Sequence, residues 1–213
     1  LGADQNGFAF AFRREDKATP TTEMDIIRSS APGAADDKAA GVKVELNKFY
    51  HVTATFTDKQ AKLYINGKLA NFKSYSPSTI SYDVNGKPAS GGEFTVGAMR
   101  KSSPSNAVVD DITVWSRELS TDEIKSHSCD AAASKKAMTA SKDAALVLYY
   151  NFGPGDVPGL NVLDKSKNSL DGKIYAPENS SVKWLAEDVK QYKCSDLIRL
   201  GRSQTTSNLR RRR

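Results

Sequence analysis

Residues 47–72, NKFYHVTATFTDKQAKLYINGKLANF, decide the fold. Apolar and polar side chains alternate in the first half, and one face carries Tyr50, Val52, Ala54 and Phe56. His51, Thr53 and Thr55 fall on the other face. This period of two predicts a strand buried on one side. After a polar break at residues 57–60, Leu63 and Ile65 resume the apolar face, and Asn66-Gly67 predicts a tight two-residue hairpin. We therefore expect three antiparallel strands here.

The same alternation predicts strands on both sides of this stretch, at residues 7–13, 23–28, 42–46, 93–98 and 146–152. In residues 93–98, EFTVGA, we expect Phe94 and Val96 on the core face. The Ala-, Gly-, Pro- and Asp-rich residues 29–40 predict a loop, and a second Asn-Gly pair at Asn85-Gly86 predicts another turn.

Residues 108–125, VVDDITVWSRELSTDEIK, predict a strand followed by a helix. Ser120 and Glu123 have the spacing of a capping box, and Leu119 and Ile124 are placed for a hydrophobic staple. We expect the strand to end near residue 116 and the helix to begin directly after Ser120.

These two stretches resemble the laminin-G-like and pentraxin-like jelly rolls of the concanavalin A-like lectin/glucanase superfamily. In that family an aromatic-His-Val strand precedes a Leu-Tyr-Ile-Asn-Gly strand, and an Asp-Asp-Ile-x-Val-aromatic-x-Arg-x-Leu-Ser-x-x-Glu-Ile segment closes the domain. Both patterns occur here in the family's order. The resemblance implies an all-β, two-sheet antiparallel jelly-roll sandwich with one short helix after the closing strand.

For the domain organisation we expect a laminin-G-like jelly roll at residues 1–127, with or without its full set of N-terminal strands, and a linker at 128–143. Residues 186–213 form a C-terminal arm and basic tail. Residues 144–185 resemble a domain opening, although they follow a domain closing. Either they begin the next domain of a tandem array, or residues 146–152 and 173–175 pair back onto the first sheet. We favour pairing back, since a half-domain would expose an apolar strand.

Composition excludes some partners. The chain has 213 residues and a net charge of +6, but without the six arginines at 199, 202 and 210–213 the basic and acidic residues balance at 25 each. We expect no nucleic acid partner. No apolar run approaches the roughly 18 to 20 residues of a membrane span. Because the chain begins at Leu1 and shows no charged-then-apolar leader, we expect a fragment or processed chain.

We expect no catalysis. Glycosidases of this superfamily carry Glu-x-Asp-x-x-Glu on one strand, and the nearest sequence is Glu23-Met-Asp25-Ile-Ile-Arg28, where arginine replaces the second acid. The resemblance implies a non-catalytic recognition module of an extracellular or cell-surface multidomain protein, which binds glycan or protein partners. The alternative is a structural scaffold subunit that packs against neighbours in an assembly, and a glycoside hydrolase relative is less favoured.

Calcium is the one cofactor that the resemblance implies, because many such domains hold Ca²⁺ with Asp and Asn side chains and loop carbonyls. Asp110 and Asp111 match the family's Asp-Asp pair. The rim-loop candidates for ligand binding are Asp36, Asp37, Asp83 and Asn85. We nevertheless favour no bound metal, because one aspartate of such a pair often serves structurally by anchoring a neighbouring turn.

Two cysteines, Cys129 and Cys194, permit one disulfide bond and exclude a cysteine-based zinc knuckle. In a secreted jelly roll this bond would tie the segment after the closing strand to the C-terminal arm; in a reducing compartment both thiols stay free. Asn179-Ser180-Ser181 is an N-glycosylation sequon, which is meaningful only in a secreted protein.

Overall fold

The computed structural model describes residues 7–14, 21–29, 37–38, 42–45, 48–57, 59–74, 83–84, 87–88, 94–99, 103–104, 107–129, 138, 143–153, 155 and 160–174. For the described residues within 7–38, 83–88 and 98–104, and for Lys43, the description covers the backbone alone. The chain divides into two compact units, Leu1–Ala107 (unit 1) and Val108–Arg213 (unit 2).

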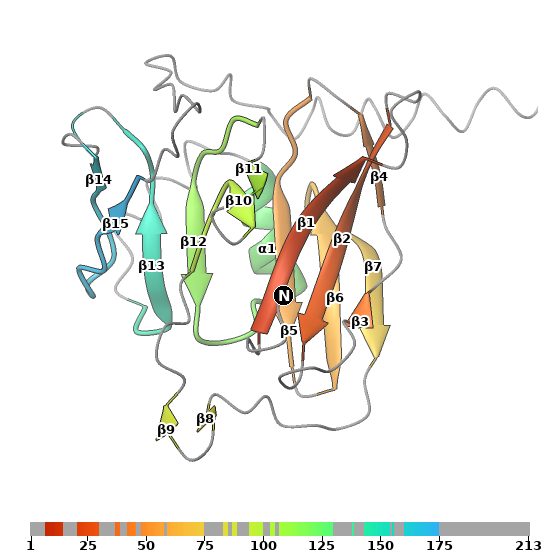
Figure 1. The fold of residues 1–213 in the computed structure, drawn as a ribbon, viewed down its shortest axis with the longest axis horizontal. Coiled ribbons are helices and arrows are strands. Elements are labelled where there is room, and N and C mark those ends of the chain that lie inside the picture. Colours follow the sequence, from red (N-terminus) through yellow and green to blue (C-terminus); the bar gives the residue numbers. More distant parts are fainter. Residues whose placement is uncertain are drawn as a thin grey trace, which may run out of the picture. The chain divides into compact units, whose positions relative to one another are not determined.

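The first sheet of unit 1 is built around β2 (Thr21–Ser29). It pairs antiparallel with β1 (Gly7–Arg14) along its length and, on its other edge, with β3 (Asp37–Lys38) and β4 (Val42–Glu45). Figure 1 shows these strands from red to orange. The short strand β3 lies inside the predicted 29–40 loop, so that part of the loop prediction is wrong. Its two residues extend the ladder of β2.

The second sheet of unit 1 is the predicted meander. It consists of β5 (Val52–Phe56), β6 (Gln60–Ile65) and β7 (Lys68–Ser74), paired antiparallel in chain order. Asn66 and Gly67 join the last two strands with φ values of 50° and 74°. Positive φ at both central residues is the type I′ geometry that matches strand twist. The Asn66 side chain also accepts a hydrogen bond from the backbone N–H of His51 at 2.9 Å.

The core of unit 1 lies between β4 and the β5–β6 hairpin. Val44 packs with Ala61 and Leu63, all three buried. Around them lie the partly buried side chains Val42, Tyr50, Val52, Phe56 and Ile65. The two sheets therefore meet through the face that the alternation predicted, which confirms the expected inward side of the hairpin.

The opposite face of this hairpin is not simply exposed. Thr55 and Tyr64 point away from Leu63, and both are buried. The prediction of a strand covered on one side is therefore wrong at these two positions. Alternation assigns side chains to faces, but burial of the second face depends on what tertiary structure packs there.

Two short hairpins complete the described part of unit 1. β8 (Asp83–Val84) pairs with β9 (Lys87–Pro88) across the predicted Asn-Gly turn, and β10 (Ala98–Met99) pairs with β11 (Ser103–Pro104). The predicted core strand at residues 93–98 is wrong. Phe94 is 61% exposed, and Gly97, at φ 79°, interrupts the extended backbone before β10 begins.

Unit 2 is organised by the pairing of β12 (Ile112–Trp115) with β13 (Leu146–Tyr150). Between them in the chain lies the helix α1 (Thr121–Cys129), which starts where the sequence predicted. β14 (Asn161–Val162) and β15 (Gly172–Lys173) form a separate antiparallel pair. Lys173 thus pairs with Asn161. The predicted pairing of residues 146–152 and 173–175 onto the first sheet, and the assignment of residues 144–185 to the first domain, stay predictions.

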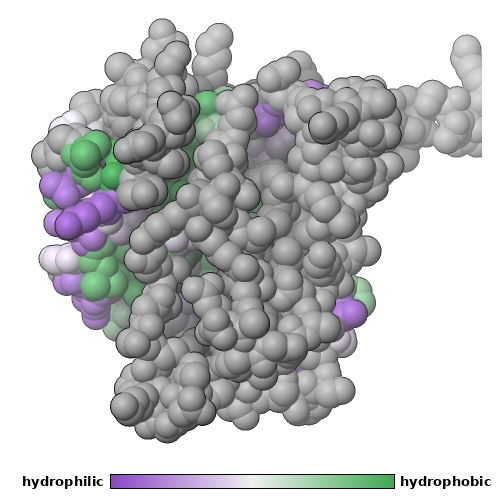
Figure 2. All heavy atoms as spheres, in the orientation of Figure 1, coloured by the Kyte–Doolittle hydropathy of each residue, from purple (hydrophilic) through white to green (hydrophobic). Residues whose placement is uncertain are grey.

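The β14–β15 hairpin leaves apolar side chains in solvent. Leu160 and Leu170, which precede its two strands, are both exposed. Figure 2 shows hydrophobic residues in green beside hydrophilic ones in purple over this part of unit 2. This mixed surface is ordinary for a soluble domain, since single exposed leucines are common.

Antiparallel sheets and a short helix after β12 make up the described residues. The predicted fold class, an all-β antiparallel sandwich with a short helix, is therefore confirmed.

Gly172 gives a test of the packing in unit 2. A Cβ at this position would lie 2.9 Å from the Tyr150 hydroxyl oxygen, which is itself held by a 2.7 Å hydrogen bond to the Leu170 carbonyl. We expect Gly172→Ala to lower the free energy of unfolding by about 1 to 3 kcal/mol, measured by urea denaturation. In a Tyr150→Phe background the loss should shrink, because the clashing oxygen is gone; an equal loss in both backgrounds would contradict the assigned clash.

Candidate functional site

The predicted acidic pair stands directly before β12. The backbone of Asp111 has φ 51°, a left-handed conformation that Asp tolerates better than most residues. Its N–H donates to the Asp110 side chain at 2.9 Å, and its own carboxylate accepts a hydrogen bond from the Tyr149 hydroxyl at 3.2 Å. Asp111 therefore anchors β13 to the start of β12.

This arrangement fits calcium poorly. Ca²⁺ takes six to eight oxygen ligands, and the part of the chain that the structure describes contains no group of three His, Cys, Asp or Glu side chains able to hold a metal ion. Because the Tyr149 hydroxyl already engages Asp111, the described residues favour a structural role for it. A calcium site that draws on other loops stays a prediction.

The other predicted site residues are not brought together by the described structure. Asp37 lies in β3 and Asp83 in β8, each with its backbone alone described. Asp36, Asn85, Asn179 and Cys194 lie outside the described residues. Cys129 ends α1, and its disulfide bond to Cys194 stays a prediction.

The start of α1 is held by the predicted capping box. The Ser120 N–H donates to Glu123 Oε2 at 2.8 Å, and the Glu123 N–H donates to Ser120 Oγ at 3.2 Å. This reciprocal pair satisfies two backbone donors at the helix start. Leu119 and Ile124, the two residues of the predicted staple, are both buried.

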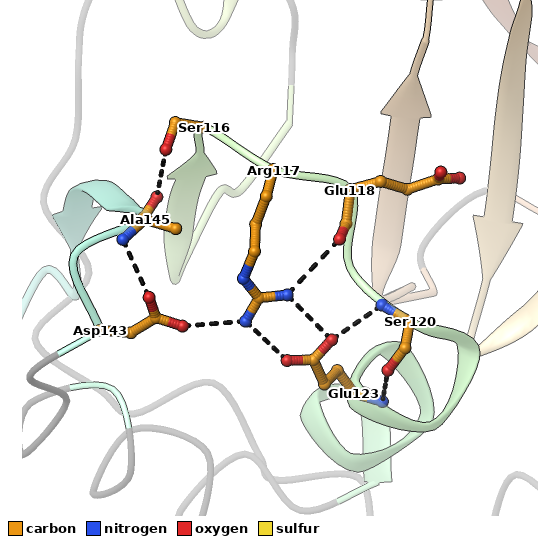
Figure 3. A network of polar contacts seen from close by, with 7 residues as sticks. All are labelled: Ser116, Arg117, Glu118, Ser120, Glu123, Asp143 and Ala145. Atoms are coloured by element: carbon orange, nitrogen blue, oxygen red, sulfur yellow. Dashed lines mark hydrogen bonds and ion pairs between the residues drawn. The ribbon is translucent and has the colours of Figure 1, made fainter.

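Arg117 joins this cap to the segment before β13 (Figure 3). Its guanidinium donates to both carboxylate oxygens of Glu123, at 3.0 and 2.7 Å, and to Asp143 Oδ2 at 2.8 Å. The other Asp143 oxygen accepts from the Ala145 N–H at 2.9 Å, and the Ser116 N–H donates to the Ala145 carbonyl at 2.9 Å. The planar guanidinium thus ties the start of α1 and the end of β12 to the segment before β13, 26 residues further along the chain.

The charges of this cluster stabilise one another. The hydrogen bonds from Arg117, with those from Ser120, lower the pKa of Glu123 to about 2, and the bond from Arg117 lowers the pKa of Asp143. The same bonds to the two carboxylates raise the pKa of Arg117. All three side chains are more than a third exposed, so solvent screens the pairs. Chemically, both acids are ionised hydrogen-bond acceptors at neutral pH.

Another carboxylate, that of Asp164, organises the turn that follows β13. Its Oδ1 accepts from the backbone N–H groups of Tyr149 and Ser166, and its Oδ2 accepts from the Leu170 N–H, each at 2.9 Å, and from Ser166 Oγ at 2.7 Å. Asn168 Nδ2 donates to the Val147 carbonyl at 2.7 Å. Burial alone would raise the pKa of Asp164, but these hydrogen bonds outweigh it and lower the pKa.

The Asp164-x-Ser166-x-Asn168 pattern lies in this turn, within the segment that resembles a domain opening. The structure shows that it fastens that turn to β13, because its donors and acceptors reach the backbone of Tyr149 and Val147. This linking role could not be predicted from local sequence, since the bonded residues are 15, 19 and 21 positions apart in the chain.

The capping box can be tested by removing the serine hydroxyl. We expect Ser120→Ala to lower the free energy of unfolding by about 1 kcal/mol, because the Glu123 N–H loses its acceptor. Ser126→Ala is the matched control, since Ser126 is exposed within α1 and alanine favours helix. Urea denaturation followed by circular dichroism measures both, and equal losses in the two variants would count against the cap.

The turn after β13 can be tested through Asp164. Asn offers one acceptor oxygen in place of two, so we expect Asp164→Asn to strand backbone donors and lower the free energy of unfolding by about 2 kcal/mol or more. Asp171→Asn is the control, because Asp171 accepts a single bond, from the Asp164 N–H at 2.9 Å, and asparagine keeps that oxygen. A loss as large in the control would show that charge, and not the number of acceptors, matters.

Comparison with known proteins gives a match to a family model. Neither the curated proteins nor the solved structures contain a match. In the described residues the structure has no helix with the length and apolarity of a membrane crossing. A laminin G family model, described as the concanavalin A-like lectin/glucanases superfamily, matches residues 2–125, which include both predicted motifs. Because that match spans more than half of the chain, the protein belongs to the concanavalin A-like lectin/glucanase superfamily.

Proposed function

We propose that this chain is a non-catalytic recognition module that acts outside the cell and binds glycan or protein partners as part of a larger multidomain protein. A concanavalin A-like lectin/glucanase domain fits a carbohydrate- or protein-binding module, and laminin-G-like domains are typically extracellular. The observation that carries the proposal is the family match over residues 2–125.

The state of the carboxylates supports a role without catalysis. A glycosidase needs a carboxylic acid whose pKa is raised, so that it can protonate the leaving group. Glu123, Asp143 and Asp164 have lowered pKa values, and each is held by hydrogen-bond donors. On β2, Glu23 and Asp25 share a face by register, whereas Arg28 falls on the other.

An exposed aromatic side chain supports recognition at the rim. In the chain, Phe94 lies between residues 73–92 and 99–106, which together with residues 29–40 are the segments that we expect to form binding loops, and it is 61% exposed. Aromatic side chains supply large contact areas to sugars and to protein partners. The third expected loop, residues 29–40, is described only at β3.

One observation, on β7, favours the alternative of a structural scaffold subunit. A bulge at Ala70 places Leu69 opposite Tyr64 and Phe72 opposite Lys62, so both apolar side chains share one face. They are 53% and 55% exposed. Such a pair favours packing against a neighbouring subunit.

The proposal is tested on the full chain, secreted from an oxidising host. We expect binding on an array of neutral, sialylated and sulfated glycans or to immobilised extracellular matrix proteins, with and without calcium, and no release of reducing ends from the oligosaccharides. Phe94→Ala should weaken binding at least about tenfold, which is the loss of one contact of about 1.4 kcal/mol. Phe72→Ala is the matched control, an equally exposed aromatic on β7, and should bind as the wild type.

Two outcomes decide against the proposal, and a third would move its binding surface. Hydrolysis of any oligosaccharide would establish an enzyme. Absence of binding, together with self-association that Phe72→Ala abolishes in analytical ultracentrifugation, would favour the scaffold. Binding that survives Phe94→Ala but is lost in Phe72→Ala would move the recognition surface to β7. Loss of binding on chelation alone would add the predicted calcium.

A further inference from the structure

The last turn of α1 packs on β12 through two aromatic rings. The His127 ring stacks on Trp115, with ring centroids 6.0 Å apart and an interplanar angle of 18°. Trp115 in turn packs on the buried side chains of Met138, Leu146 and Tyr149. The imidazole is half-buried, so its ionisation directly affects the contact between helix and sheet.

The charged groups around His127 have opposite effects on the protonation of its imidazole. On α1, Glu123 lies one turn earlier and attracts a proton on the imidazole, but the Arg117 fork and the Ser120 N–H already occupy its oxygens. From the end of β12, Arg117 lies with its guanidinium carbon 5.3 Å from the Trp115 ring centroid and repels that proton. Asp143, before β13, keeps Arg117 in this place. The exposed Asp122 and Lys125 of α1 pair with each other at 3.6 Å.

Burial decides the balance. It is the largest influence on the imidazole and lowers the pKa of His127; Glu123 opposes this shift, and Arg117 adds to it. Contact with the Trp115 face and the helix C-terminus acts in the opposite direction, because both favour the charged imidazole.

We infer that the stack of His127 on Trp115 is a pH-sensitive contact, which holds the C-terminal turn of α1 on β12 while the imidazole is neutral and loosens when mild acid protonates it. The unfolded chain takes up the proton more readily than the folded one. Stability is therefore full above about pH 6.5, the ordinary histidine value, and falls as the pH drops through the lower folded value. The carboxylates described above lose their contributions only below their ordinary values of 4.5 and 3.8, in a separate range.

The test compares the wild type with His127→Phe, which keeps an aromatic ring on Trp115 but cannot titrate, and with His51→Gln, which removes the other histidine. Urea denaturation is measured at about pH 7.5 and about pH 5.5, on either side of the ordinary histidine value. We expect the unfolding equilibrium constant to rise severalfold on acidification in the wild type and in His51→Gln, and to stay level in His127→Phe. In a Trp184→Phe background, Trp115 emission should titrate in the wild type and not in His127→Phe.

An unfolding equilibrium constant of the wild type that does not change between the two pH values would overturn the inference. A pH dependence that persists in His127→Phe or disappears in His51→Gln would overturn it as well. Should His127→Phe fail to fold, the imidazole resonances of the wild type decide by themselves. A His127 titration midpoint below about 6.5 supports the inference, and a midpoint at or above it overturns it.

Discussion

The packing of β4 onto the β5–β6 hairpin is the interaction on which unit 1 depends. An isolated hairpin is marginally stable in water, because its apolar face has nothing to cover it. Here Val44 closes over Ala61 and Leu63 and thereby joins the two sheets of the unit. The Tyr50 hydroxyl reinforces this junction by accepting a hydrogen bond from the Glu45 N–H at 3.0 Å.

In unit 2, charged side chains join the segments to one another. Asp111, Asp164 and Arg117 each connect segments that are distant in the chain, and each is occupied by the contacts that it makes. A carboxylate that accepts several hydrogen bonds is stabilised in its ionised form. Such a group can hold segments together, but it does not suit the role of a general acid, which must carry a proton. The acidic residues of the described site thus support β12, α1 and β13.

The Asp-Asp pair illustrates why residue type alone does not identify a metal site. The same oxygens that coordinate a hard cation also accept hydrogen bonds from backbone N–H and hydroxyl groups. What separates the two roles is convergence, since a cation needs several oxygens around one point. Asp111 instead faces the Tyr149 hydroxyl and takes the backbone into a left-handed conformation at the start of β12.

The sequence by itself determined the features that depend on neighbours within a few residues. The Asn66-Gly67 turn, the inward face of the β5–β6 hairpin and the Ser120–Glu123 cap follow from backbone preference and from alternation, and the structure contains them. The family resemblance followed from the same short patterns.

Only the tertiary structure decided which of these faces a second layer covers. Phe94 alternates like a core residue but is exposed, while Thr55 has the alternation of a surface residue but is buried. The hydrogen bond from Arg117 to Asp143, 26 residues away, could not be predicted from the local sequence either. Such outcomes depend on packing and on long-range hydrogen bonds, and the free energy of these contacts is not contained in the preference of any single segment.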